Sequence, residues 1–148
     1  MKAQINFETR GITQLQDDDV RTWLKNVISH YKFEYSEINF TFYSDTELLE
    51  MNKTYLNHDF FTDIITFDNT INHTISADIA ISVDRIKDNA LQNKVDFSQE
   101  LKRVMVHGIL HCMGFLDKTD EQQVIMRNEE DKMLNMFHVE HLNEKDNV

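Results

Sequence analysis

Two periods of apolar residues alternate along this chain, a period of two that is typical of strands and a period near 3.6 that is typical of helices. Residues 38–43 and 77–83 alternate apolar and polar side chains. Residues 64–67 form a short β-branched run, and a first strand is expected near residues 4–8. The pattern therefore predicts four short strands.

Helical spacing fills most of the remaining chain. It predicts helices over residues 17–31, 45–56, 84–93, 98–113 and 120–137. Ser44-x-x-Glu47 and Thr119-x-x-Gln122 have the form of capping boxes, and Ser98 is a plausible N-cap. The order strand, helix, strand, helix, two strands and three helices implies an α+β protein in which helices cover one small sheet.

Composition narrows the class of protein. The 148 residues are 41% apolar, with three glycines and no proline, which fits one globular domain over 1–148 and excludes collagen-like or low-complexity chains. The single cysteine excludes an internal disulfide, and the polar start Met1–Asn6 lacks the apolar run of a signal peptide. We expect a soluble, cytoplasmic protein without a membrane segment.

The charge balance bears on possible partners. Fifteen Lys and Arg stand against 26 Asp and Glu, a formal net charge of −11. Because capture of nucleic acid needs clustered cations, any role on RNA must be local or assisted by a partner. The acidic residues after Thr119 are interpreted as a solvated helix face.

Candidate chemistry is concentrated in residues 107–117. His107 and His111 are one helical turn apart, and at about 100° per residue Glu100 falls in the same wedge of an otherwise apolar helix. Gly114 is placed to end that helix in a left-handed conformation and to return Asp117 towards the two histidines. Two imidazoles and one carboxylate would leave a coordination position open, as a catalytic zinc requires.

Simpler interpretations compete with a metal site. A histidine on an apolar helix is more often a core residue whose hydrogen bonds are satisfied, and His-x-x-x-His pairs arise by chance. Asp117 could cap the next helix. Cys112 lies on the opposite, apolar side of the helix and is expected to pack in the core. The residue after His107 is Gly108 rather than the glutamate of His-Glu-x-x-His peptidases, so the base would be a metal-bound hydroxide or another carboxylate.

The segment resembles the YbeY family of metal-dependent endoribonucleases, whose signature is His-Gly-x-Leu-His-x-x-Gly-Tyr-Asp-His. The matching positions are His107, Gly108, Leu110, His111 and Gly114, with Phe115 in the tyrosine place. Residues 51–55, 62–67 and 78–82 are similar to further family elements, as are Phe97, Glu100-Leu101, Met126 and Glu129. The resemblance thus extends over most of the chain.

The resemblance implies a fold, a reaction and partners. The fold would be one α+β domain with a four-stranded mixed sheet, about five helices and the metal site on a central buried helix. The activity would be cleavage of single-stranded RNA in ribosomal-RNA maturation, at the 3′ end of 16S ribosomal RNA, and in ribosome quality control, with the small ribosomal subunit or its proteins as partners. His107, His111 and Asp117 would hold one ion, most simply Zn²⁺.

Two departures from the family pattern matter. The third family histidine falls on Asp117, and a site of two histidines and one aspartate also suits Fe(II), Mn(II) or Ni(II). The family arginine falls on Leu56, and His58, Lys53 or Arg85 are the candidates to replace it in binding substrate. A smaller change puts Ala77 where the family has glycine.

Carboxylates are the candidates for further roles. Asp63 is a candidate catalytic residue beside the cleft, although Thr62 and Asp63 could simply form a turn. Glu100 is a second candidate catalytic residue, which either orients a histidine through a hydrogen bond or lies on the surface. Asp78 either lines the site or points to solvent.

The aromatic pair Phe60 and Phe61 has two interpretations. The rings could stack on bases, or they could anchor their loop to the core, which is the commoner use of aromatic pairs.

Two other functions remain open. The protein could be a ribosome-assembly factor with a structural metal, which an acidic protein docking on basic ribosomal proteins would favour. It could also be a metal hydrolase or oxygenase acting on a small substrate, because two histidines and a carboxylate form the facial triad of iron oxygenases.

Overall fold

The computed structural model describes residues 3–9 and 17–146, so Met1 and Lys2 of the polar start lie outside the described residues. Nine elements follow in the order that the hydrophobic pattern predicts. They are β1 (Gln4–Glu8), α1 (Asp17–His30), β2 (Glu34–Tyr43), α2 (Asp45–Leu56), β3 (Ile64–Asp68), β4 (Thr74–Ser82), α3 (Val83–Asn93), α4 (Phe97–Cys112) and α5 (Asp120–Asp146).

The strands form one mixed sheet in the order β1-β2-β4-β3. β1 and β4 run parallel to β2, whereas β3 pairs with β4 in antiparallel register, with Ile64 opposite Ile81. Strand β2 begins at Glu34, before the predicted start at residue 38. The register between β2 and β4 shifts between Tyr35 and Ile38. An irregularity of this kind breaks the period of two that reveals a strand.

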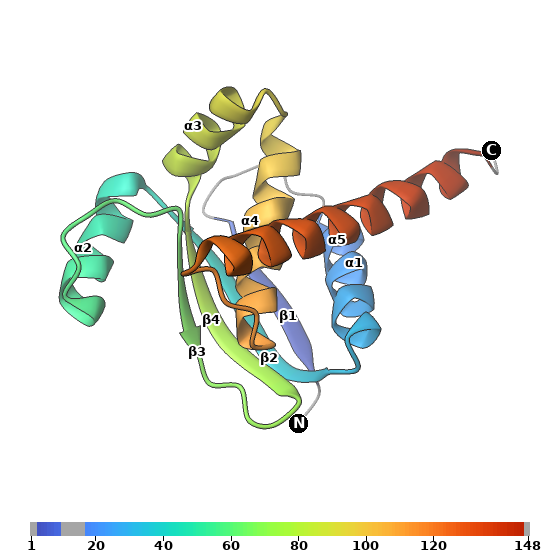
Figure 1. The fold of residues 1–148 in the computed structure, drawn as a ribbon, viewed down its shortest axis with the longest axis horizontal. Helices are drawn as coiled ribbons and strands as arrows, with labels where there is room; N and C mark the ends of the chain where they lie inside the picture. Colours follow the sequence, from blue (N-terminus) through green and yellow to red (C-terminus); the bar gives the residue numbers. More distant parts are fainter. Residues whose placement is uncertain (1–2, 10–16, 147–148) are drawn as a thin grey trace.

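Alternation along β4 divides its side chains between the two faces of the sheet. Ile79 and Ile81 enter the main core with residues of α1, α4 and α5. Ala80 faces the other way and joins a smaller cluster with Leu48 of α2 and Ile65. Helix α4 therefore lies on one face of the sheet, with α1 and α5 packed beside it, while α2 covers part of the opposite face (Figure 1).

Helix ends follow local side-chain chemistry, with one correction. Ser44 and Glu47 form the expected capping box, and Gln122 and Thr119 bond reciprocally at the start of α5. The N-cap of α4, however, is Asp96, whose carboxylate accepts from the Gln99 amide at 2.8 Å, so the Ser98 prediction is wrong. Aspartate caps as well as serine, and the earlier start adds Phe97 to the helix.

Helix α5 also continues to Asp146, past the predicted end at residue 137. No glycine or proline follows Phe137 to end the helix there. No helix in the described parts of the chain combines the length and the hydrophobicity needed to cross a membrane.

Candidate metal centre

Helix α4 is the buried helix that carries the candidate site. Three of its apolar residues, Leu101, Met105 and Ile109, are at most 1% exposed. Gly108 faces the sheet so closely that an added Cβ would lie 3.0 Å from Ile64 Cδ1. The position that peptidases fill with a glutamate is thus a contact between helix and sheet, and His107 and His111 project from the edge of that contact.

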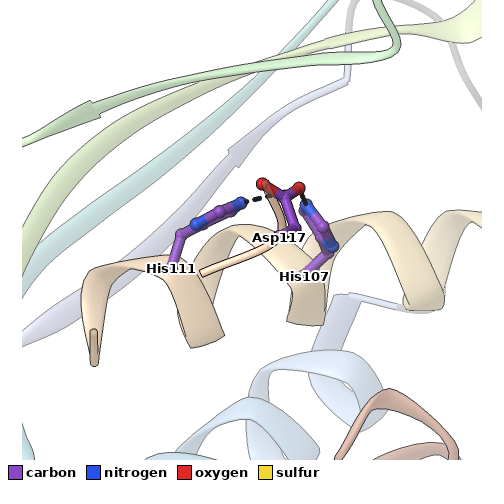
Figure 2. Close-up of side chains that lie close together, drawn as sticks. All are labelled: His107, His111 and Asp117. Atoms are coloured by element: carbon purple, nitrogen blue, oxygen red, sulfur yellow. Dashed lines mark hydrogen bonds and ion pairs between the residues drawn. The ribbon is translucent and has the colours of Figure 1, made fainter. Parts of the chain in front are cut away.

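The three residues expected to bind a metal converge. Nε2 of His107 and Nε2 of His111 each lie 3.2 Å from Oδ2 of Asp117 (Figure 2). All three potential ligand atoms lie within 4.8 Å of one another. Zinc binds histidine nitrogen and carboxylate oxygen at about 2.0–2.2 Å, so one ion fits between them with small side-chain adjustments.

Gly114 makes this convergence possible. Its φ of 101° turns the chain directly after α4, a conformation that side-chain-bearing residues rarely adopt. The turn brings Asp117 back over the helix that it has just left. The expected cap role of Asp117 is wrong, because α5 begins at Asp120 with Thr119 in its capping box.

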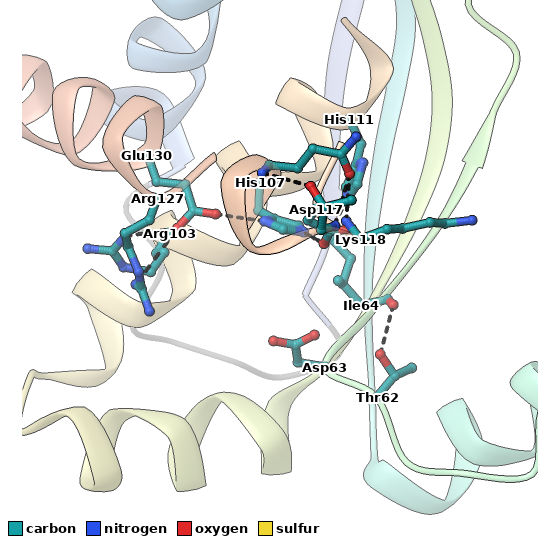
Figure 3. Close-up of polar contacts among 12 residues, drawn as sticks. Thr62, Asp63, Ile64, Arg103, His107, His111, Asp117, Lys118, Arg127 and Glu130 are labelled. Atoms are coloured by element: carbon teal, nitrogen blue, oxygen red, sulfur yellow. Dashed lines mark hydrogen bonds and ion pairs between the residues drawn. The ribbon is translucent and has the colours of Figure 1, made fainter. Parts of the chain in front are cut away.

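Glu130 of α5 fixes one of the two histidines. Its Oε2 lies 2.6 Å from Nδ1 of His107, and its Oε1 accepts from Nη1 of Arg103 at 2.8 Å (Figure 3). Nη2 of Arg103 donates to Asp131 at 2.7 Å. Because a carboxylate can only accept, Nδ1 of His107 donates to it and Nε2 is left to bind a metal.

Sequence reasoning missed Glu130, which it counted with the solvated acidic face. The structure buries it to 5% exposure between Met126 and Met133, each 2% exposed. The sequence did contain a signal for a buried Glu130, because residues 126, 130 and 133 lie on one stripe of a helix. A carboxylate inside an apolar stripe needs a partner.

The electrostatics of the site follow from this burial. Burial by itself lowers the pKa of His107, but the hydrogen bond and charge of Glu130, with Asp117 and Asp63, outweigh it and raise the pKa. Burial raises the pKa of Asp63 in spite of the nearby His107. The pKa of Glu100 is raised in the same way, although Asn93 and Arg103 oppose the shift.

The structure gives Glu100 a place that neither expectation described. It lies in the same wedge of α4 as His107, but it is 4% exposed and accepts a hydrogen bond from Asn93 at 3.4 Å. The surface position is therefore wrong, and the expected hydrogen bond to a histidine is made by Glu130 instead.

Two hollows meet at the candidate centre. One, here called the α3 hollow, has a volume of about 530 Å³ and lies among α3, α4 and α5, with Asn93, Glu100 and Arg127 in its wall. The other, the β3 hollow, measures about 660 Å³ and is lined by β3, Leu56 and Lys118. His107, Asp117 and Asp63 line both, so the centre lies at their junction.

Asp63, directly before β3, accepts hydrogen bonds through both its main chain and its side chain and lines both hollows. Its carbonyl accepts from the Ser82 amide at 2.9 Å, and its carboxylate accepts from Asn89 at 3.3 Å. Thr62 bonds to the carbonyl of Ile64 at 3.2 Å, as a turn residue would. Asp78 is exposed and accepts from Asn39 at 2.9 Å, so it points to solvent rather than into the site.

The candidate substrate-binding cations are engaged in ion pairs. Arg85 pairs with Asp45 and Asp88, and Lys53 lies between Glu50 and Asp59. Lys118, which sequence reasoning did not single out, follows Asp117 and extends over the strands beside the centre (Figure 3).

The loop between α2 and β3 carries exposed rings. Phe60 and Phe61 are 55% and 52% exposed, so their interpretation as core anchors is wrong. His58 stacks on Phe60 with ring centroids 5.0 Å apart, and the Arg85 guanidinium lies 5.7 Å from the Phe61 centroid.

Comparisons with known proteins point to one family. A family model described as Endoribonuclease YbeY matches residues 4–138. A protein named Endoribonuclease YbeY from Flavobacterium johnsoniae is 46% identical over 137 residues, which are 92% of this chain and 99% of that protein. Proteins of the same name from Flavobacterium psychrophilum and Christiangramia forsetii are 43% identical over 136 residues and 42% identical over 140 residues. These matches cover 92% and 94% of this chain, and 94% and 98% of the relatives.

The fold also has a solved counterpart. The solution structure of a Thermotoga maritima protein superposes with a TM-score of 0.69 at 21% identity, covering 98% of this chain and 96% of that one. This likeness supports the α+β architecture.

Proposed function

This chain belongs to the Endoribonuclease YbeY family, and from that premise we propose that it cleaves single-stranded RNA at a metal ion held by His107, His111 and Asp117. The observation that carries the proposal is the convergence of these three side chains at the junction of two hollows. A polymer entering one hollow and leaving by the other would place a phosphodiester at the ligand cluster. We assign the activity to ribosomal-RNA maturation in the cytoplasm.

The ligand set suits a divalent metal. When bound, such an ion polarises the scissile phosphate and lowers the pKa of a water molecule towards about 7. Zn²⁺ is our preferred ion because two imidazoles and one carboxylate with an open position are typical of catalytic zinc, and Fe(II), Mn(II) and Ni(II) are the alternatives.

The residues around the ligands have separate tasks in this proposal. Glu130 and Arg103 hold the His107 ring so that Nε2 faces the metal position. Asp63 is the candidate general base, because its carboxylate lines both hollows and burial raises its pKa towards the working range of a proton acceptor. Glu100 lies in the wall of the α3 hollow, two helical turns from His107.

Substrate contacts must be local because the chain as a whole is acidic. Lys118 lines the β3 hollow, and Arg127 lines the α3 hollow beside the ion-paired Arg103. Lys118 and Arg127 are the proposed phosphate contacts. Phe60, Phe61 and His58 offer exposed rings for base stacking, with Arg85 supporting Phe61.

A second candidate function has one observation in its favour. The net charge of −11 suits docking on basic ribosomal proteins, so the chain could act as an assembly factor of the small subunit with a structural metal. RNA cleavage that depends on the metal ligands separates the two functions.

The test uses a labelled single-stranded RNA, the purified protein and its His111→Ala variant, prepared in parallel. We expect about one divalent ion per chain and cleavage for the unmodified protein, and loss of both in the variant. His58→Ala is the matched control, since it removes a histidine outside the ligand cluster and should retain the metal. Metal near one per chain in His111→Ala, or equal cleavage by both proteins, would refute the assignment.

A further inference from the structure

The α3 hollow has a polar pattern that metal binding does not explain. Asn89 and Asn93 are one turn apart on α3, and each donates its side-chain amide to a carboxylate across the hollow, Asn89 to Asp63 at 3.3 Å and Asn93 to Glu100 at 3.4 Å. Both distances are long for such bonds, so these groups retain capacity for a further partner. A volume of about 530 Å³ gives that partner room.

The Asn93–Glu100 pair presents three groups in a fixed order. The Asn93 amide offers an N–H donor, and the two oxygens of Glu100 offer two acceptors. Donor, acceptor, acceptor is the pattern that the pairing edge of cytosine shows to guanine. Guanine, with O6 beside N1–H and N2–H, displays the complementary order, whereas uracil, adenine and cytosine do not.

The spacing along α4 fits a nucleotide. Glu100 is seven residues before His107, a rise of about 10 Å along the helix. This is the scale of the reach from a phosphate, across its ribose, to the pairing edge of its base. Arg127, whose side chain is 55% exposed, lies in the same wall and can contact the plane of a base or its phosphate.

We propose that the α3 hollow is a base-recognition subsite for guanine, occupied by a nucleotide next to the cleaved bond, with Glu100 and Asn93 reading its pairing edge. The proposal rests on the proposed function, because it takes the phosphate of that nucleotide to lie at the ligand cluster. It gives Glu100 a specificity role instead of the catalytic role expected from its helix position.

Mononucleotides test the subsite without any cleavage, because they contain no internucleotide bond. The experiment measures the dissociation constants of guanosine, adenosine, cytidine and uridine 5′-monophosphates for the metal-loaded protein by calorimetry. We expect guanosine monophosphate to bind roughly tenfold tighter than the others, since a bidentate base contact discriminates by about that factor or more.

Glu100→Gln changes the last acceptor of this hydrogen-bonding pattern to a donor. The hollow then shows donor, acceptor, donor, which complements uracil, so the ratio of guanosine to uridine monophosphate affinity should fall at least tenfold. Cleavage of an adenine oligomer with one central guanine or uracil should shift in the same direction. Glu34→Gln, on the exposed start of β2, makes the same chemical change far from the hollow and should leave the ratio unaltered.

The outcomes separate the two proposals. Equal binding of the four nucleotides, no binding of guanosine monophosphate at millimolar concentration, or an unchanged ratio in a folded Glu100→Gln would overturn the subsite, even if RNA is cleaved. Guanine preference that inverts without any RNA cleavage would support the subsite and refute the nuclease. If Glu100→Gln does not fold, Asn93→Ala removes only the donor to O6 and should still weaken the preference for guanine.

Discussion

The two histidines of the candidate centre differ in what supports them. His107 is held through Nδ1 by Glu130, which is itself held by Arg103. The side chains alone are 22% exposed for His107, 7% for Glu130 and 17% for Arg103. His111 contacts Asp117 and faces the β3 hollow, which is also lined by Leu56 and Thr62 on either side of the exposed aromatic rings in the chain. One side of the centre is therefore rigid and internal, and the other is open to a substrate.

This difference separates two properties that a metal site must combine. In the proposed site, retention of an ion would depend on the buried, ion-paired side, because its ligand is already oriented before binding. Access of a polymer depends on the open side, where few contacts would have to break. Substitutions on the two sides should accordingly produce different defects.

The largest effect is expected from Glu130→Ala. It removes the partner of Nδ1 of His107 and leaves Arg103 with Asp131 alone in a buried position, so metal affinity should fall about 10- to 100-fold and stability by about 3–5 kcal/mol. Chelator competition and denaturant unfolding measure the two losses.

The neighbouring carboxylate supplies the control for that change. Glu129 bonds to Tyr31 and Lys132 and makes no contact with His107 in the described structure, so Glu129→Ala should retain metal affinity. Equal losses of affinity in both variants would contradict the distinction between the two sides.

Gly114→Ala tests the turn that returns Asp117 to the two histidines of α4. At φ 101° an alanine is strained, so we expect a stability loss of about 1–2 kcal/mol and weaker metal binding as Asp117 is displaced. Thermal unfolding with and without zinc measures both. An unchanged zinc-induced rise in Tm would mean that Asp117 does not need this turn.

Replacing Phe60 and Phe61 together by serine should affect the open side alone. Base stacking is worth about 1–3 kcal/mol per base, so KM for RNA should rise about tenfold or more. Metal content should stay the same, because these exposed rings are not ligands. Loss of metal in this variant would show that the loop supports the centre after all.

The smallest effect is expected from Tyr31→Phe, which removes the hydrogen bond from Tyr31, directly after α1, to Glu129 of α5 and should cost about 1 kcal/mol. Burial alone would raise the pKa of Glu129, but Tyr31 and Lys132 outweigh it and lower the pKa below its usual 4.5. A lowered carboxylate pKa contributes stability that is present above about pH 4.5 and is lost as the pH falls through the folded value. The difference between the two proteins should therefore shrink in acid, which urea unfolding at several pH values can test.

Local sequence was sufficient to predict much of the candidate metal centre but little of the residues that surround it. The spacing of His107 and His111, the position of Gly114 and the return of Asp117 are all encoded within one turn or one loop, and the structure has them as predicted. Glu130 could not be placed in this way, because its contact with His107 depends on how α5 packs on α4. The same holds for Glu100, whose direction was predicted but whose partner on α3 was not.

The elements of the fold show a similar division. All nine elements were predicted, most of them from periodicity, which burial on one face imposes, and β3 from its short β-branched run. Errors occurred where periodicity is absent or has competitors: the irregular start of β2, the choice between Asp96 and Ser98 as a cap, and the exposed rings of the 57–63 loop.

The short sequence distance between the candidate ligands also has a kinetic consequence. His107, His111 and Asp117 lie within residues 107–117, so bringing them together closes a very small loop and costs little chain entropy. Glu130, by contrast, reaches His107 only after α5 has docked. During refolding, the ability to capture an ion should therefore arise before the ability to retain it tightly, and stopped-flow mixing with a zinc-sensitive dye would separate these two stages.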